Sequence, residues 1–288
     1  MKKHIIITLT IGLLIMVAAS CKKDTAGSNT PAVQLPVLKT SDISAITKTT
    51  AVCGGSISSN GGAMISALGV CWSTKAEPTI ADSKTTEGAD KVTYTSSLTG
   101  LTNAAVYNVR AYATNSVGTA YGNTVTFTAL EIGQEYQGGA IAYILQPGDP
   151  GYTTNVAHGL IASPAANSEL KWFNGTYITT GATATALGTG NANTNLIVAS
   201  LGMGNYAAGK CFSEKEAAYS DWYLPGKDEL NKIYLAKNKV SSLPPKGYYW
   251  SSTESGSSTA WIQSFDTGVQ STYDKNGSGF WTWAIRSF

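Results

Sequence analysis

Few side chains of this sequence are suited to catalysis or to metal binding. Histidine occurs only at His4 and His158, and His4 lies in an N-terminal segment that we expect to be removed. A Cys and His metal cluster therefore cannot form in the mature chain, and no H-E-x-x-H, P-loop or G-x-S-x-G pattern occurs. Cys211 and His158 have the chemistry of a nucleophile and a base, but their neighbourhoods show nothing typical of such a pair. We expect a protein that is not an enzyme and has no metal and no cofactor.

Two adjacent carboxylates, Asp228 and Glu229, are the remaining candidates for acid–base chemistry. They follow the sequence D-W-Y-L-P-G-K at 221–227, in which Pro225 ends a strand. Adjacent helix residues point in different directions, and the helix dipole favours anions in the first turn, so both carboxylates are explained without catalysis. The apolar residues that would share one face of this helix are Leu230, Ile233 and Tyr234. We predict a helix that packs against a sheet.

The stretch from Trp250 to Phe288 is suited to binding rather than to catalysis. It alternates Trp, Phe and Gly with Ser, Thr, Tyr and Asp. Trp and Phe bury enough area to fix a backbone, whereas Ser, Gly, Tyr and Asp make adaptable contacts at low entropic cost, as in antibody paratopes. Surface strands without any partner would have the same composition, so composition leaves both interpretations open.

We expect the ligand-binding side chains to lie along this stretch. The candidates are Ser255, Ser257, Ser258, Thr259, Ile262, Ser264, Asp266, Val269, Tyr273, Asp274, Ser278, Phe280, Trp281 and Trp283. Aromatic side chains dominate binding energies, and an exposed aromatic cluster would be costly without a purpose. The expected anchors are Tyr273, Phe280, Trp281 and Trp283. The aromatic residues expected in the core instead are Trp222, Trp250, Trp261 and Phe265.

Composition and charge limit the partners. Charged residues make up only 13% of the 288 residues and Gly numbers 30, which indicates about two globular domains rich in strands and turns. The chain has 20 Lys and Arg against 18 Asp and Glu, and loss of Lys2 and Lys3 would make these numbers equal. A polyanion needs a basic face. We therefore expect no nucleic-acid partner.

The N-terminus has the pattern of an export signal. Lys2 and Lys3 precede an apolar run over 5–17 that is too short to span a membrane as a mature helix. Small residues then precede Cys21, which resembles the lipobox of bacterial lipoproteins; an ordinary signal peptide with an incidental Cys21 is the alternative. The resemblance implies a signal peptide over 1–20, lipidation of Cys21, and a place on the outer membrane, exposed at the cell surface. Residues 21–36 predict a flexible tether.

Residues 37–130 consist of short alternating runs separated by turn residues, which is typical of an all-β sandwich. The clearest predicted strands are 51–57, 67–72, 91–96, 106–113 and 124–128. The sequence L-T-G-L at 98–101, followed by Tyr107 and by N-S-V-G at 115–118, resembles the fibronectin type III family. The resemblance implies a fold and no function, because sandwich domains have many activities.

Cysteine use leaves two alternatives in this sandwich. Cys53 and Cys71 lie in neighbouring predicted strands, and export would permit a disulfide between them. They are otherwise two small buried apolar residues. With Cys21 lipidated, three thiols remain, so at least one is free, and we expect Cys211 to be the odd, buried one.

Residues 131–288 form the second predicted domain. Its first strand is expected over 138–144, and an Asn or Thr at 193–195 would cap a helix over 196–201. A further helical stretch is expected from Tyr206 towards Phe212.

Several motifs of this second domain occur in a fixed order. They are D-W-Y-L-P at 221–225, Y-W-S-S-T-E at 249–254, A-W at 260–261, Phe265 with Gly268, and R-S-F at 286–288. Together they resemble a bacterial family with a C-type lectin-like fold, named after the C-terminal domain of a collagen-like adhesin. The resemblance implies an α+β domain whose last strands and loops form a ligand-binding face. The Glu-Pro-Asn, Gln-Pro-Asp and Trp-Asn-Asp signatures of calcium-dependent lectins do not occur, so calcium-mediated sugar binding is not predicted.

A lipoprotein with a sandwich spacer and such an end is also similar to the variable proteins of diversity-generating retroelements. Adenine mutagenesis in those systems changes asparagine codons into a restricted residue set. The members of that set here are Ile262, Ser264, Asp266, Val269, Tyr273, Asp274, Gly277, Ser278 and Phe280. Trp281 and Trp283 lie outside the set, although an adenine-rich arginine codon could yield Trp.

The sequence thus predicts a multidomain receptor or adhesin, anchored by lipid, whose C-terminal face is diversified and binds a protein or glycan at a cell surface. The alternative is a structural subunit of a fimbrial tip or surface layer, which would have its apolar patch on the sandwich. A carbohydrate-active enzyme is third, because carboxylate pairs for glycoside cleavage can lie far apart in a sequence.

Overall fold

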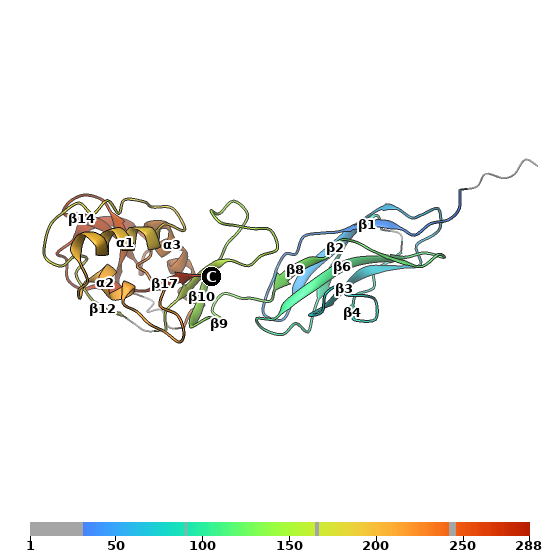
Figure 1. The fold of residues 1–288 in the computed structure, drawn as a ribbon, viewed down its shortest axis with the longest axis horizontal. Helices are drawn as coiled ribbons and strands as arrows, with labels where there is room; N and C mark the ends of the chain where they lie inside the picture. The colour runs from blue at the N-terminus through green and yellow to red at the C-terminus, as the bar shows by residue number, and fades with distance from the viewer. Residues whose placement is uncertain (1–30, 90, 165–166, 242–245) are drawn as a thin grey trace, which may run out of the picture. The chain divides into compact units, whose positions relative to one another are not determined.

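The computed structural model describes residues 31–89, 91–164, 167–241 and 246–288, which are mostly β-sheet, with four sheets and three helices (Figure 1). The expected signal peptide, Cys21 and most of the expected tether lie outside the described residues. No described helix has the length and apolar character needed to cross a membrane.

Two sheets occupy residues 37–128. One has the order β1-β2-β5, and the other has the order β4-β3-β6-β7, with β8 also paired to β6. Their strands are β1 (Val37–Thr40), β2 (Ala51–Ser59), β3 (Ala67–Ser73), β4 (Ser83–Lys84), β5 (Thr93–Leu98), β6 (Val106–Thr114), β7 (Thr119–Tyr121) and β8 (Val125–Thr128). The alternating pattern explains the packing, because every second side chain of β5 is buried in a core shared with β3, β6 and β8. All five strands predicted here are confirmed to within two residues at each end.

The three described cysteines are all free and buried. Cys53 and Cys71 are therefore small apolar core residues and not a disulfide, and Cys211 is buried as predicted. Burial raises the pKa of the Cys53 and Cys71 thiols to about 11, and it also raises the pKa of Cys211. None of the three is a reactive thiolate at neutral pH.

Two further sheets lie in residues 135–287. A four-stranded sheet has the order β17-β11-β10-β9, and a five-stranded sheet, here called the C-terminal sheet, has the order β12-β16-β13-β14-β15. Their strands are β9 (Glu135–Tyr136), β10 (Gly139–Ile144), β11 (Gly159–Ala162), β12 (Asn167–Glu169), β13 (Tyr248–Glu254), β14 (Thr259–Ser264), β15 (Gln270–Asp274), β16 (Phe280–Thr282) and β17 (Ile285–Ser287). Since β17 pairs with β11, the end of the chain closes onto the start of this region.

Three helices pack against these sheets: α1 (Gly190–Leu201), α2 (Ala207–Phe212) and α3 (Lys227–Ala236). The predictions of α2 and α3 are confirmed, and Leu230 and Ile233 are buried as expected. The predicted start of α1 was wrong, because the helix begins six residues earlier and has no side-chain cap. Asn193 and Thr194 lie inside the helix and instead bond to the carbonyls of Ala184 and Leu224.

The C-terminal sheet lies between two apolar clusters. Trp250, Ile262 and Phe280 face a cluster that includes side chains of α1 and α2. Tyr249 and Phe265 belong to the other cluster, with side chains of α3 and β10. This double cover explains why most side chains of β13 and β14 are buried on both faces of the sheet.

Candidate functional site

Strand β15 is the edge of the C-terminal sheet and is exposed on both of its faces. Of the described strands, β14 alone pairs with it, and Ser271, Thr272, Tyr273 and Asp274 are all exposed. The register places Thr272 opposite Trp261 and Tyr273 opposite Ala260. Alternation along the strand therefore divides the exposed side chains between two faces.

The first face, here called the Trp261 face, consists of Thr259 and Trp261 on β14 with Thr272 and Asp274 on β15. Trp261 is half-buried, and the ammonium of Lys227 lies 4.0 Å from the centre of its ring. A cation over an indole ring is attracted by the ring quadrupole. The Trp261 face thus presents one large aromatic side chain surrounded by hydroxyls, a carboxylate and an ammonium.

Asp274 is held in place at one end of this face. Its Oδ1 accepts a hydrogen bond from the Tyr177 hydroxyl at 2.6 Å and another from the Asn276 backbone at 2.7 Å. The Tyr177 hydrogen bond lowers the pKa of the Asp274 carboxyl. Asp274 is therefore an oriented, ionised acceptor at neutral pH.

The opposite face contains an aromatic cluster, here called the Tyr273 cluster. Tyr273 and Tyr248, 49% and 48% exposed, each pack edge-on against Phe280, with ring centres at 4.8 and 5.9 Å. Phe280 in turn contacts the buried Trp250 ring at 4.7 Å. Two tyrosines with exposed edges and hydroxyls are thus fixed on a rigid aromatic base.

A buried ion pair supports the loops around both faces. Lys275 is 0% exposed at its side chain and Glu254 is 1% exposed, and the Lys275 ammonium donates to the Glu254 carboxylate. Glu254 also accepts hydrogen bonds from the backbone N–H groups of Thr180 and Gly181. A buried ion pair is tolerated when further hydrogen bonds satisfy each partner, as they do here.

Lys275 holds the hairpin between β13 and β14 by hydrogen bonds to backbone carbonyls of the hairpin. Its ammonium donates to the Ser257 carbonyl at 2.8 Å, and its N–H donates to the Ser258 carbonyl at 2.9 Å. The side chains of Ser257 and Ser258 are exposed. The loop is therefore fixed by groups that every residue type possesses, which leaves these two side chains free to differ.

The structure divides the predicted binding residues into accessible and buried sets. The accessible or partly accessible ones are Ser255, Ser257, Ser258, Thr259, Asp266, Val269, Tyr273, Asp274, Ser278 and Trp281. The buried ones are Ile262, Ser264, Phe280 and Trp283, at 1–7% exposure. A side chain that is closed off from solvent cannot contact a partner, so the role assigned to these four residues requires correction.

The reason lies in the direction of each side chain. Ile262 on β14 and Phe280 on β16, the strands on either side of β13, point into the cluster beneath α1 and α2. Trp283 points into the cluster beneath α3. Trp281 is half-buried against the same cluster as Trp283. Of the four predicted anchors, Tyr273 is the most accessible, at 49% exposure.

Two site residues escaped the sequence interpretation. Trp261 was expected in the core with Trp222, Trp250 and Phe265, and only the other three are buried. Tyr248 was not considered. Alternation along β14, the strand next to the edge, could have indicated Trp261, since it lies between the buried Ala260 and the buried Ile262.

One member of the set expected to vary has a structural requirement. A Cβ atom on Gly277 would lie 2.5 Å from the Phe280 ring and 2.8 Å from the Tyr273 ring. A side chain at this position would displace the Tyr273 cluster. Gly277 is thus a packing residue and not a variable contact.

A polar hollow of about 380 Å³ borders the loop that contains Ser278. Its other lining residues include Glu169, Lys171, Asn174 and Asn205. These side chains offer donors and acceptors of the kind that sugar hydroxyls use. Among the described residues, no group of three or more His, Cys, Asp or Glu is placed to hold a metal ion.

Comparisons with known proteins give no family. No family model matches the chain, and no curated protein matches it. It has a likeness to the sensor domain of the anti-sigma factor RsgI4 of Pseudobacteroides cellulosolvens, with 16% identity and a TM-score of 0.26, over 35% of this chain and 100% of that chain. A myokine structure gives 15% identity and a TM-score of 0.26, over 34% and 98% of the two chains. A fimbrial protein of Bacteroides ovatus gives 12% identity and a TM-score of 0.40, over 77% and 64%. These TM-scores are too low to support an argument about fold or function.

Proposed function

We propose that this protein is a lipid-anchored surface receptor or adhesin whose partner, a protein or a glycan, binds at β14, β15 and the hairpin 255–259. The observation that supports this most is the way the hairpin is held. Lys275 fixes Ser257 and Ser258 through their carbonyls, so their side chains contribute to recognition without a cost to the fold. Binding would use Tyr273, Tyr248 and Trp261 as aromatic anchors, with hydroxyls and Asp274 around them.

In this proposal the first two sheets form a fibronectin type III-like sandwich. Tyr107 supports this assignment, because its hydroxyl accepts a hydrogen bond from the Thr102 backbone at 2.9 Å, as in a tyrosine corner. The turn at Asn115, whose side chain accepts hydrogen bonds from the N–H groups of Val117 and Gly118, also supports it. The second pair of sheets, with its three helices and its C-terminal strand β17 paired to β11, would be the C-type lectin-like domain.

The proposed diversification by a retroelement applies to accessible positions only. Asp266, Val269, Tyr273, Asp274 and Ser278 are exposed, so changes there would alter a surface. The neighbouring DNA tests this part of the proposal. We expect a reverse transcriptase gene and an imperfect repeat of the final codons that differs at adenines, and the absence of both would leave an adhesin with a fixed binding face.

Binding itself is tested with the full chain on a glycan array and on intact cells. We expect the double variant Tyr273→Ala and Trp261→Ala to lose at least tenfold in affinity for whatever the wild type binds, since each aromatic anchor contributes about 1 kcal/mol or more. The matched control is Leu235→Ala, because Leu235 is 68% exposed on α3 and belongs to neither aromatic site. Equal losses in both variants, or none in either, would place the binding face elsewhere.

A structural subunit is the second candidate, and one observation favours it. Apolar side chains are exposed on the sandwich, among them Met64 at 85% and Val92 at 69%. In a polymer a neighbouring copy would cover such residues. Light scattering of the purified full chain tests this candidate, which requires an increase in mass with concentration.

A further inference from the structure

The sandwich has a distinct end at which the described chain begins. The Gln34 N–H donates to the Gly61 carbonyl at 2.8 Å. The Asn115 amide donates to the carbonyls of Gln34 and Asn60 at 2.6 and 2.9 Å. These bonds hold the entering segment, the loop after β2 and the turn after β6 together as one surface, here called the apolar cap.

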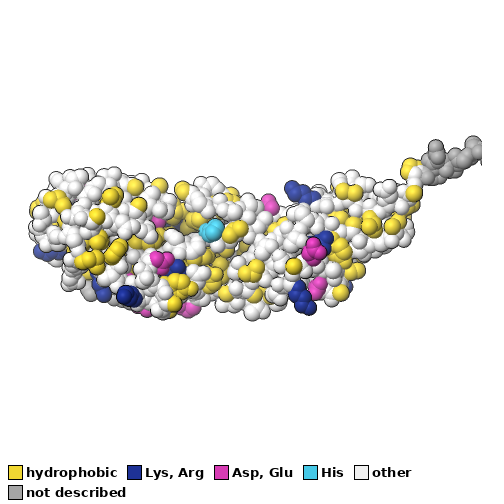
Figure 2. Space-filling model, in the orientation of Figure 1, with side chains coloured by type: hydrophobic (Ala, Val, Ile, Leu, Met, Phe, Trp, Pro, Cys, Tyr) yellow, Lys and Arg dark blue, Asp and Glu magenta, His cyan; other side chains and the backbone are white. Residues whose placement is uncertain are grey.

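The apolar cap exposes more large apolar side chains than scattered surface residues would explain. Its exposed members are Val33, Leu35, Val37, Met64, Val92 and Val117, with fractions from 43% for Val33 to 85% for Met64. Figure 2 shows hydrophobic side chains spread over this end of the sandwich. Single exposed apolar residues are normal on a protein surface, but several at one end of a domain, two of which border a hollow, favour a contact with something apolar.

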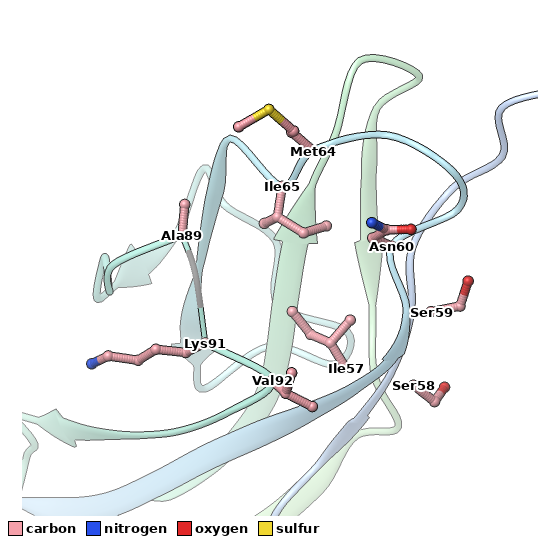
Figure 3. A pocket seen from close by; sticks show the side chains of 9 residues that line it. All are labelled: Ile57, Ser58, Ser59, Asn60, Met64, Ile65, Ala89, Lys91 and Val92. Carbon is pink, nitrogen blue, oxygen red and sulfur yellow. The ribbon is translucent and has the colours of Figure 1, made fainter.

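A hollow of about 440 Å³ opens within the cap. In Figure 3 the side chains of Ile57, Ile65 and Val92 lie around it, Met64 stands at its rim and Lys91 points away from it. Ile57 and Ile65 are half-buried and belong to the margin of the sandwich core. The hollow therefore extends the apolar surface inward, where a hydrocarbon chain or an apolar side chain would fit.

Among the described residues that line the hollow, Lys91 is the one charged side chain, and it has an acidic partner. The Lys91 ammonium lies 3.5 Å from the Glu87 carboxylate in an exposed ion pair. Such a pair gives no strong preference for an anionic surface. Contact at the cap would therefore be apolar, and it would depend little on salt or on the charge of the partner.

We propose that the apolar cap docks into the boundary between head groups and acyl chains of the membrane to which Cys21 is attached. This inference rests on the lipid anchor of the proposed function. Docking would insert Met64 and the neighbouring Val and Leu side chains a few ångströms below the head groups, as amphipathic surfaces do. It would also fix the orientation of the sandwich at the membrane.

The distance along the chain favours lipid over a second copy as the occupant. Eleven residues lie between Cys21 and Val33, and five of them are Gly, Ser, Thr or Asn. As the flexible tether that the sequence predicts, a segment of this length would have a root-mean-square span of about 20 Å. The anchor would keep the cap within reach of the membrane at an effective concentration in the millimolar range, so a weak apolar contact is populated. A second copy has no comparable advantage.

The test uses the full lipidated chain in phosphatidylcholine vesicles, with a fluorophore attached at Met64→Cys. The native thiols of Cys53, Cys71 and Cys211 are buried and do not compete for the label. We expect quenching by doxyl-labelled lipids to be at least twofold at Met64→Cys and absent at the control Leu235→Cys. A second variant combines Val33→Ser, Leu35→Ser and Val117→Ser, and it should reduce the quenching at Met64→Cys about tenfold. Adding anionic lipid to the vesicles should change the quenching at Met64→Cys by less than twofold.

The anchor and the docking are tested by different measurements. Flotation with the vesicles and mass spectrometry of Cys21 test the anchor, whereas quenching tests the cap. A chain that floats with acylated Cys21 but shows no quenching at Met64→Cys overturns the docking and keeps the anchor. Absence of acylation at Cys21, with quenching at Met64→Cys that persists when Cys21→Ser removes the competing thiol, keeps the docking and removes the anchor. A label protected from aqueous iodide but not quenched by lipid identifies a second copy as the occupant and also overturns the proposal.

Discussion

Asp274 and Lys275 are adjacent in the sequence and opposite in their surroundings. Asp274 is exposed at the end of β15, whereas the Lys275 side chain is completely buried and paired with Glu254. The first belongs to the accessible edge and the second to an internal frame that holds the loops of that edge. Comparing these two regions shows how one stretch of chain can combine an interior that requires particular residues with a surface that tolerates many.

The frame requires particular residues, because its charged groups are buried away from water and need specific partners. The Lys275 ammonium has four partners: the carbonyls of Ile178 and Ser257, the Glu254 carboxylate and, at 4.5 Å, the Trp172 ring. No residue other than lysine supplies such an ammonium on a flexible stem. The exposed positions of β15 do not require a particular residue type, since their side chains point into solvent.

The largest expected effect follows from breaking the frame. Glu254→Ala would leave the Lys275 ammonium and the N–H groups of Thr180 and Gly181 without their acceptor. We expect a loss of about 4 kcal/mol in the free energy of unfolding, because an uncompensated buried charge remains. Denaturation followed by tryptophan fluorescence measures it, since six of the seven Trp residues lie after residue 131.

A double-mutant cycle separates the pair from the packing. Lys275→Met removes the charge that Glu254→Ala leaves behind, so the double variant should be more stable than the sum of the two single effects predicts, by about 2 kcal/mol. Additive effects would mean that the two side chains are not coupled and that the frame depends on each separately.

The next effect contrasts two aromatic residues that touch each other. Phe280→Ala removes a ring that is 7% exposed and packed on Trp250, and we expect a loss of about 3 kcal/mol. Tyr273→Ala removes a ring that is 49% exposed, and we expect a loss of less than about 1 kcal/mol. Similar losses for both variants, measured in the same denaturation experiment, would show that the aromatic cluster is one core and not a core with an accessible edge.

Much of the architecture could be predicted from the sequence. Alternation predicted the five clearest strands of the sandwich, and Pro225 with the first-turn acids predicted α3. The start of α1 could not be predicted, because Asn193 and Thr194 have side chains typical of caps but form tertiary hydrogen bonds inside the helix. Local propensity does not show which distant carbonyl a polar side chain will meet.

The accessibility of the residues in the candidate site was predicted only in part, and their role in binding stays a prediction. Small polar residues of the hairpin and β15 were expected to be accessible, and they are. Composition could not distinguish Trp261 from Trp283, since both are tryptophans in an alternating stretch, and their burial depends on which strand lies at the edge of the sheet. The strand order is set by pairings between distant segments, which no local pattern specifies.

A smaller effect is expected from the Arg286–Asp221 ion pair, which shares no hydrogen-bond partner with the frame among the described residues. The bidentate hydrogen bond from Arg286 lowers the pKa of the Asp221 carboxyl. A depressed folded-state pKa contributes stability above the unfolded pKa of about 3.9, and this contribution is lost as the pH falls through the folded pKa. The free energy of unfolding should be measured for wild type and for Asp221→Asn as a function of pH. The difference, wild type minus variant, should be constant above about pH 5 and should decline below about pH 4. The difference is small, because the Asp221 side chain is 53% exposed.

The pKa of Glu229 is shifted in the opposite direction from that of Asp221. Burial raises the pKa of its carboxyl, so its contribution is present below the unfolded pKa and is lost as the pH rises through the folded pKa. Glu229 is present in wild type and in Asp221→Asn, so its contribution cancels in their difference. A difference that fails to decline below about pH 4 would contradict the lowered pKa of Asp221.

The smallest effect is expected on the edge itself. Ser271→Asn and Thr272→Asn change side chains that are exposed on opposite faces of β15, and the backbone bonds to β14 remain. Each variant should alter the free energy of unfolding by less than about 0.5 kcal/mol. Ile262→Asn is the matched control, because Ile262 lies opposite Ser271 in the register but is 3% exposed, and burying an amide there should cost several times more. If the three variants were equally stable, the side chains of β14 and β15 would not differ in burial. The distinction between a buried interior and an accessible edge strand would then be wrong for these two paired strands.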